Sequence, residues 1–240
     1  MRVLTLALLL LATLAQAEPR VLRFSVVDSW AMPLARIEEG RLTGGILFDF
    51  FTGTAQRVGL KPDFRILPRA RVEQALLRHD IDVRCYVAPE WVEHQFQDYR
   101  WSAPLMVQRD LLVGRGLMPA RIDQLTGEPV GTVLGYRYPR LRPLLQSGRL
   151  VRDEARNQEL VLKKLLAGRY RYAISSEIAL DWFNRELPEA RRLQPVDVIE
   201  ETALGCLVLD SPELPTQSIL DALAAMKDSG EIERILQHYR

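Results

Sequence analysis

Apolar residues recur along the chain with two alternating spacings, and these spacings predict an order of strands and helices. Short runs rich in β-branched residues predict strands at 20–27, 63–67, 81–87 and 105–113. Apolar residues at helical spacing predict helices at 47–58 and 69–78, and the glycine-containing stretch 28–45 is predicted to be a loop. This β-α-β-α-β order predicts an α/β fold with a mostly parallel sheet and helices on its faces.

The second half of the chain repeats this organisation. Strands are predicted at 130–134, 172–175 and 204–209, with helices at 141–146, 159–167 and 178–186. Two further helices close the chain and are separated at Ser229-Gly230. Two such units, with no low-complexity linker between them, predict two lobes around a cleft. A ligand would bind at the carboxyl ends of the strands.

The first seventeen residues have the three-part pattern of a secretory signal peptide. A positive start at Met1-Arg2 precedes the apolar run 3–15, and Ala15-Gln16-Ala17 provides small residues around a cleavage point. The run is shorter than the ~20 residues that span a bilayer, although a retained anchor is the alternative. No later stretch has eighteen consecutive apolar residues. We expect an exported protein, periplasmic after cleavage, with no membrane insertion.

Composition narrows the possible functions. With 26% charged and 48% hydrophobic residues, the chain is ordinary globular protein rather than a disordered or fibrous one. Its formal charge of +1 falls to zero when Arg2 is removed, so nothing favours nucleic acid as a partner. The three histidines are scattered, and we expect neither a metal nor a cofactor. Export permits a disulfide between Cys85 and Cys206 if their strands are neighbours, and two buried free thiols are the alternative.

Six short motifs then follow one another in a recognisable order. They are 40–44 (GRLTG) with Asp49, 75–82 (ALLRHDID), 101–104 (WSAP), 130–135 (VGTVLG), 166–169 (LAGR) and 226–232 (MKDSGEI). These motifs resemble those of the periplasmic solute-binding proteins of the amino-acid type, bacterial extracellular solute-binding family 3. The resemblance covers nearly all of 20–240 and implies a two-lobed type II periplasmic-binding fold. It implies a first lobe of 18–113 and 203–240 and a second lobe of 114–202.

The same resemblance implies that the strand at 203–209 returns to the first lobe, beside the strand that carries Cys85. A disulfide between Cys85 and Cys206 is then favoured.

The chain departs from the family at the ligand clamp. In the amino-acid-binding members of this family, an arginine in a turn binds the α-carboxylate of the ligand. Residues 88–91 (APEW) resemble that turn but have Trp91 at the position of the arginine. In the second lobe, only Glu177 could replace the aspartate that usually holds the α-ammonium group. An indole cannot make a bidentate contact with a carboxylate. We therefore do not expect a standard α-amino acid as the ligand.

The predicted loops at strand ends supply the candidate ligand-binding residues. Aromatic side chains could stack on a flat or cationic group, and Arg137 or Arg69 could hold an anionic one. The alternative is that Trp30 and Tyr86 belong to the core and that the arginines are solvated. The candidates are Asp28, Trp30, Arg69, Tyr86, Trp91, Tyr136, Arg137, Ser175 and Glu177.

The resemblance implies a monomeric binding protein rather than an enzyme. It would close on a small polar solute and deliver it to an inner-membrane transporter permease, of the ABC type. One alternative is a degenerate binder that serves as a sensor or partner-docking subunit. Another is a periplasmic dehydratase-like enzyme, in which Glu177 would be the acid and Arg137 would hold a substrate carboxylate.

Overall fold

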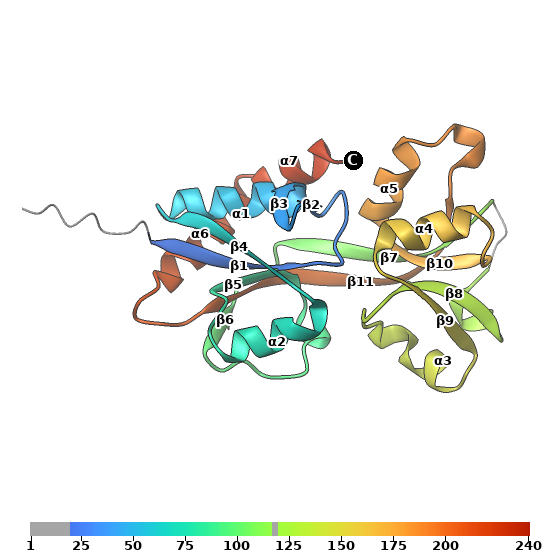
Figure 1. Ribbon diagram of the computed structural model, residues 1–240, viewed down its shortest axis with the longest axis horizontal. Coiled ribbons are helices and arrows are strands. Elements are labelled where there is room, and N and C mark those ends of the chain that lie inside the picture. The colour runs from blue at the N-terminus through green and yellow to red at the C-terminus, as the bar shows by residue number, and fades with distance from the viewer. Residues whose placement is uncertain (1–19, 117–119) are drawn as a thin grey trace, which may run out of the picture.

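The computed structural model describes residues 20–116 and 120–240. Its main feature is a nine-stranded sheet that extends from one end of the molecule to the other (Figure 1). The predicted signal peptide 1–17 lies outside the described residues. The strand order is β4 (Lys61–Leu67), β1 (Val21–Val27), β5 (Val83–Val87), β11 (Gln194–Leu209), β7 (Met106–Gly114), β10 (Tyr172–Ser176), β8 (Glu128–Val133) and β9 (Leu150–Ala155), and β6 (Tyr99–Trp101) pairs with β11. A separate hairpin joins β2 (Arg36–Glu38) to β3 (Arg41–Gly44).

Parallel pairs lie at both ends of this sheet, and antiparallel pairs lie in its middle. β1 is parallel to β4 and β5, and β8 is parallel to β9 and β10. The long strands β7 and β11 pair antiparallel with each other between these two groups. β11 also pairs with β5, and β7 pairs with β10. The two α/β units are therefore joined by two adjacent strands.

Helices cover both faces of the sheet (Figure 1). At the β1 end, α1 and α6 lie on one face and α2 on the other. At the β8 end, α4 and α5 lie on the upper face of the view and α3 on the lower one. The helices are α1 (Ile46–Arg57), α2 (Arg69–Leu77), α3 (Arg142–Gln146), α4 (Gln158–Leu166), α5 (Glu177–Arg185), α6 (Thr216–Asp228) and α7 (Glu231–His238). Within the described part of the chain, no helix is both long and apolar enough to cross a membrane.

The start of α1 shows how the sequence determines a local structure. Gly45 precedes the helix with a φ of 103°, a region that residues with a side chain rarely adopt. A Cβ atom there would lie 2.7 Å from the carbonyl oxygen of Leu34. The helix then buries Phe50 and Phe51, and the Phe51 ring stacks on Phe24 of β1 with centroids 4.5 Å apart.

The apolar core is divided between the two ends of the sheet. One cluster draws its buried residues from 22–105 and 206–232, and two others draw theirs from 111–199. We call the parts built on these cores the first and the second lobe. Residues 110–114 of β7 pair with β10, so the far end of β7 belongs to the sheet of the second lobe.

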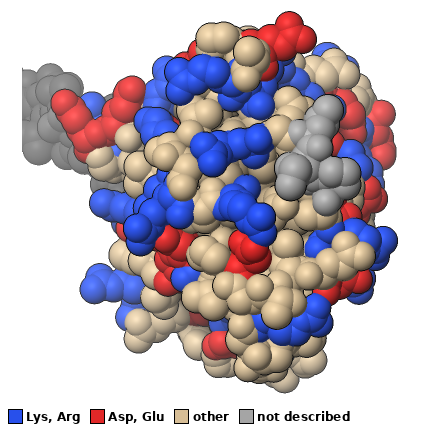
Figure 2. Space-filling model, turned by 90° about the vertical axis from the view of Figure 1, so that its right-hand side faces the viewer, with Lys and Arg blue, Asp and Glu red and all other residues tan. Residues whose placement is uncertain are grey.

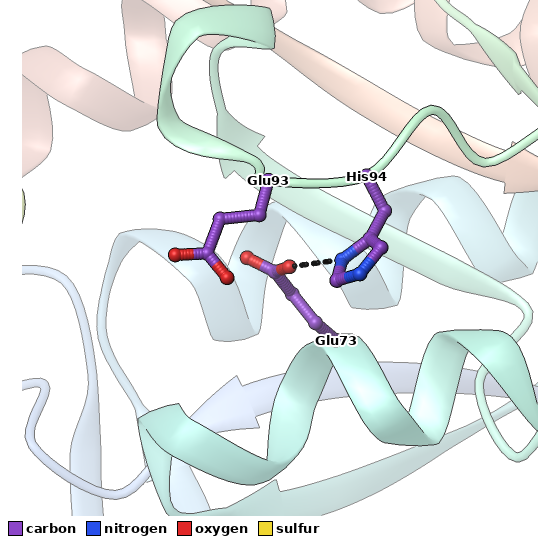
Figure 3. A group of neighbouring side chains, drawn as sticks. All are labelled: Glu73, Glu93 and His94. Carbon is purple, nitrogen blue, oxygen red and sulfur yellow. Dashed lines mark hydrogen bonds and ion pairs between the residues drawn. The ribbon is translucent and has the colours of Figure 1, made fainter.

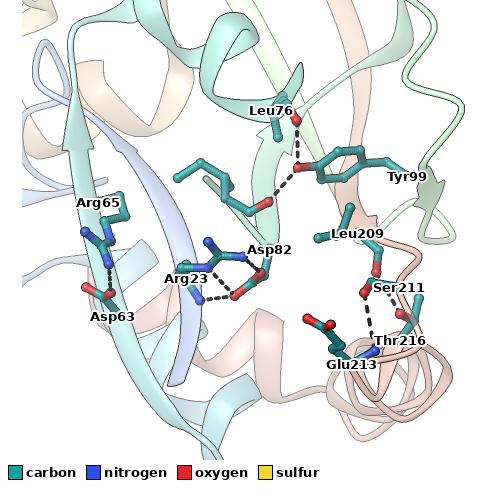
Figure 4. Close-up of polar contacts among 11 residues, drawn as sticks. Arg23, Asp63, Arg65, Leu76, Asp82, Tyr99, Leu209, Ser211, Glu213 and Thr216 are labelled. Atoms are coloured by element: carbon teal, nitrogen blue, oxygen red, sulfur yellow. Dashed lines mark hydrogen bonds and ion pairs between the residues drawn. The ribbon is translucent and has the colours of Figure 1, made fainter. Parts of the chain in front are cut away.

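Cross-links within the first lobe hold β5 against its neighbours. Cys85 of β5 and Cys206 of β11 form a disulfide, as the family resemblance favoured. The Arg23 guanidinium of β1 donates to both carboxylate oxygens of Asp82, at 2.5 and 3.0 Å (Figure 4). The Tyr99 hydroxyl donates to the carbonyl oxygen of Ile81 at 2.6 Å. These contacts position β5, whose end leads into the cleft.

Candidate functional site

A cavity lies between the two lobes, at the ends of the strands that the sequence indicates. Its walls come from the loop after β1, the start of α2, the end of β5, the middle of β7, the turn after β8 and the end of β10. Its volume is about 50 Å³. Since one water needs about 10–15 Å³ of such space, the cavity holds several waters or a very small solute. A larger solute would require the lobes to move apart.

Most of the predicted ligand-binding residues meet at this cavity. The first lobe contributes four and the second lobe contributes two. They are Trp30, Arg69, Tyr86, Trp91, Tyr136 and Arg137. Asp28, Ser175 and Glu177 are the three candidates that do not line it.

The positions of these three residues have simple causes. Side chains alternate along a strand, so Ser175 of β10 is fully buried and Ser176 faces the cavity instead. Asp28 precedes the cavity-lining part of its loop. Glu177 begins α5 and its carboxylate accepts a hydrogen bond from Arg109 Nη1 at 2.6 Å, in a different groove.

Trp30 and Tyr86 form one aromatic wall. Their rings meet edge to face with centroids 6.1 Å apart. Trp30 is also part of the first core, so the core interpretation of this residue and the ligand-binding interpretation are both compatible with its place.

Tyr86 combines an unusual backbone with a polar group that lacks a partner. Its φ of 57° is rare for a bulky residue. Its hydroxyl is buried with no hydrogen-bond partner among the described residues. Burial raises the pKa of this phenol well above its usual value, so it remains a donor at neutral pH. A strained backbone and a free donor are frequent at binding sites.

Asp110 and Gln108 of β7 also line the cavity, and sequence reasoning missed both. Asp110 is only 7% exposed, and its Oδ1 accepts a hydrogen bond from Gln108 Nε2 at 2.8 Å. Burial raises the pKa of the Asp110 carboxyl to about 7. The available signal was a lone acidic residue within an apolar strand, where a carboxylate needs a reason to be buried.

Two arginines connect the lobes across the cavity. Arg69 of α2 donates from Nε to the carbonyl oxygen of Gly135 at 2.9 Å, and its guanidinium carbon lies 4.7 Å from the centroid of the Tyr136 ring. Desolvation lowers the pKa of Arg69. Arg137 of the second lobe pairs with Glu93 of the first. These contacts stabilise the closed arrangement of the lobes.

Glu73, Glu93 and His94 come together at the outer edge of this region (Figure 3). Their possible metal-ligating atoms lie within 4.8 Å of one another, and His94 Nδ1 lies 3.0 Å from Glu73 Oε2. Arg137 pairs with Glu93 and lies 3.9 Å from Glu73. Since the guanidinium of Arg137 already pairs with Glu93 and lies within ion-pair distance of Glu73, we interpret the group as an ion-pair cluster between the lobes and assign no metal to it.

The fold has close counterparts among solved structures. No model of a protein family and no curated protein matches the chain. An ancestral arginine-binding protein bound to arginine is 19% identical over 91% of this chain and 97% of its own, with a TM-score of 0.71. The arginine-, lysine-, histidine-binding protein ArtJ from Geobacillus stearothermophilus is 16% identical over 92% and 95%, with a TM-score of 0.69.

A sensor protein shares the same architecture. A histidine kinase sensor domain with similarity to periplasmic binding proteins is 20% identical over 92% of this chain and 96% of its own, with a TM-score of 0.72. At these identities the likeness concerns the fold. The chain has the two-lobed type II fold of the periplasmic amino-acid-binding proteins, as its motifs predict.

Proposed function

We propose that the chain is an exported binding protein that encloses a small polar solute between its two lobes. The observation that carries this proposal is the cavity at the lobe interface, to which both lobes contribute polar and aromatic side chains. Polar groups in such a cavity fix the orientation of a ligand, and aromatic faces supply contact area. Among them, Tyr86 has a buried hydroxyl with no hydrogen-bond partner in the described residues.

The arrangement of strands supports a mechanism of hinge closure. Among the described residues, only β7 and β11 run from one lobe to the other in the sheet, so a small change in these two strands would move the lobes as bodies. A solute that contacts both lobes binds the closed state more tightly and so shifts the population toward it. In this proposal Arg69 and Arg137 have a second role, because their contacts across the cleft favour closure before a solute arrives.

The position of Trp91 bears on the class of solute. Trp91 lines the cavity where the family resemblance implies a carboxylate-binding arginine, so a standard α-amino acid lacks its usual contact. Delivery of the solute to a transporter permease in the inner membrane, export by the signal peptide 1–17 and the monomeric state belong to the same proposal.

A sensor or partner-docking role is the second candidate. It is favoured by the contacts that hold the lobes together without a solute, and a sensor domain of a histidine kinase has the same fold. The dehydratase-like alternative has less support, because Glu177, its candidate acid, is paired with Arg109 away from the cavity.

A thermal-shift screen of residues 18–240 tests the proposal. The panel contains amino acids, dicarboxylates, amines, polyamines and aromatic acids. A solute at 100 times its dissociation constant adds about 2.7 kcal/mol to the free energy of unfolding, which is about 5–10 °C in Tm for a chain of this size. A shift with one class of solute supports a binder. A stable protein that responds to no member of the panel contradicts it and favours the docking role.

A further inference from the structure

Arg84 is a buried cation that forms no ion pair with a described residue, although Glu73 lies near enough for its charge to act on it. It lies on β5 between Val83 and Cys85, and the residue is only 7% exposed. Its Nη1 atom has no hydrogen-bond partner among the residues that the structure describes. Desolvation, aided by the charge of Arg69, lowers the pKa of Arg84 to about 10, so it still carries its charge at neutral pH. Burying such a charge without a partner costs stability, which calls for a reason.

Arg84 lines a groove that continues from the cavity. The groove runs between α2 and the segment 91–94 and is open to solvent, and the turn of the second lobe at Gly135 and Arg137 forms its opposite side. Arg69 and Arg137 line the groove as well as the cavity. Three guanidinium groups therefore converge there from three separate elements of the fold.

The acidic side chains of the groove are already in use. Arg137 pairs with Glu93 and lies within ion-pair distance of Glu73, and Glu73 also contacts His94 at 3.0 Å. Arg69 makes its hydrogen bond to a neutral carbonyl group. Arg84 and Arg69 thus form no ion pair with a carboxylate of the described chain, and the three guanidinium groups of the groove face only two carboxylates.

Several other basic side chains of this protein have acidic partners. Figure 2 shows the end of the second lobe, where basic and acidic side chains lie close together. In this lobe Lys164 and Arg169 pair with Asp153, and Arg171 pairs with Glu128. The half-buried Arg23 of the first lobe is matched by Asp82. Arg84 differs from all of these, although it is more deeply buried.

We propose that Arg84 and Arg69 form a binding site for an oxyanion, the carboxylate or phosphate group of a small solute that extends from the cavity into this groove. A guanidinium donates two parallel hydrogen bonds to either group. The positive charges of the two guanidinium groups together would balance the negative charge of the oxyanion. Since Nη1 of Arg84 is covered in this arrangement, the anion would reach it while the lobes are apart. This inference rests on the proposed solute-binding function and names the ligand group.

The test compares residues 18–240 with the variant Arg84→Met, which keeps the length of the side chain and removes its charge. The probes are sodium succinate and sodium phosphate, each compared with sodium chloride at equal ionic strength. We expect at least one probe to raise the Tm of the wild type. Because hydrogen bonds to charged groups contribute about 1.5–3 kcal/mol, Arg84→Met should raise the dissociation constant of that probe by about 10- to 100-fold. Without a probe, Arg84→Met should have a higher Tm than the wild type.

Two further variants make the result specific. Arg71→Met removes an exposed arginine of the same helix as Arg69 and should respond to the probes like the wild type. Arg69→Met should weaken the response as Arg84→Met does, and it provides the test if Arg84→Met does not fold. A response to succinate alone identifies a carboxylate, and a response to phosphate alone identifies a phosphate group.

The outcomes separate this inference from the proposed function. No response of the wild type to either probe, or an equal response of the wild type and both cleft variants, overturns the oxyanion site. If amines or neutral solutes of the panel still raise the Tm, the binding function stands without this site. If succinate or phosphate raises the Tm of the wild type and Arg84→Met weakens this response, the oxyanion site is supported, whichever partner receives the solute.

Discussion

Replacing Asp110 with asparagine should make the protein more stable at pH 8 and change its stability much less at pH 4.5. Asp110 faces the cavity, is 7% exposed and accepts a hydrogen bond from Gln108 Nε2 at 2.8 Å. Burial raises its pKa from 3.8 to about 7. Asparagine has the shape of the protonated carboxyl group and retains an oxygen that can accept the hydrogen bond from Gln108.

The sign of the effect follows from proton binding. Between about pH 4 and pH 7 the folded protein keeps a proton on Asp110 that the unfolded chain has lost. The free energy of unfolding therefore falls as the pH rises through this range, and the cost is fully present above pH 7. A pKa difference of about three corresponds to at most about 4 kcal/mol. At pH 8, Asp110→Asn should recover about 1–4 kcal/mol of it.

Urea unfolding at pH 4.5 and pH 8 measures this difference directly. We expect the gain of Asp110→Asn over the wild type to be at most about 1 kcal/mol at pH 4.5 and several-fold larger at pH 8. Asp228→Asn, at an exposed position of α6, is the control and should change stability by less than about 0.5 kcal/mol at both values. An equal effect of Asp110→Asn at both pH values, or a loss of stability at pH 8, would refute the reasoning.

Three other variants test the fold and the cavity. Replacing both Cys85 and Cys206 with alanine opens a loop of 121 residues, and chain entropy predicts a loss of up to about 5 kcal/mol in urea unfolding. Gly131→Ala would place a Cβ atom inside the contact distance of the Tyr170 ring, so calorimetry should show a loss of about 1–3 kcal/mol. Trp91→Ala should raise the dissociation constant of any solute found in the screen by about tenfold or more, in calorimetric titration.

Each of these variants has a control in the chain. Adding a reducing agent to the wild type should produce the same loss as the double cysteine variant and should not affect that variant further. A Cβ atom at Gly44 meets its nearest neighbour at 3.8 Å, so Gly44→Ala should change stability little. Trp101, outside the cavity on β6, is the matched tryptophan, and Trp101→Ala should bind like the wild type. Equal binding by Trp91→Ala and the wild type would remove Trp91 from the site.

The regular elements could be predicted because their periodicity is local. The helix expected at 47–58 is α1 (Ile46–Arg57), and the strand expected at 20–27 is β1 (Val21–Val27). Both bury one continuous set of apolar residues, which leaves a clear pattern in the sequence. The fold class followed from the motifs and their order, and it is confirmed by the solved structures with the same architecture.

The connecting strands were harder to predict. β11 begins at Gln194, ten residues before the strand expected at 204. Its first half was not predicted because it contains Asp197, Glu200 and Glu201 and has no apolar run. The loop expected at 28–45 contains the hairpin of β2 and β3, whose short strands are mostly exposed. β11 is stabilised by pairing with distant parts of the chain, a signal that no local window contains. β2 and β3 pair only with each other, and their short, exposed strands have no apolar alternation.

The residues that line the cavity could be predicted only in part, again because some of them depend on contacts between distant parts of the chain. Residues at strand ends, such as Trp91 and Tyr136, could be placed near the cleft because ligands bind there in α/β folds. Asp110 and Arg84 lie inside strands that the apolar pattern assigned to the core. Only the folded chain reveals that β7 crosses the cleft and that Arg84 forms no ion pair with an acidic side chain of the described residues.

The central claim is that one small polar solute binds in the cavity between the lobes. The most direct measurement is a calorimetric titration of residues 18–240 with the solute that raises Tm most, carried out on the wild type and on Trp91→Ala and Trp101→Ala. The account predicts one site per chain for the wild type and for Trp101→Ala, and much weaker binding for Trp91→Ala. Binding of the same strength in all three proteins, or several weak sites per chain, would contradict it.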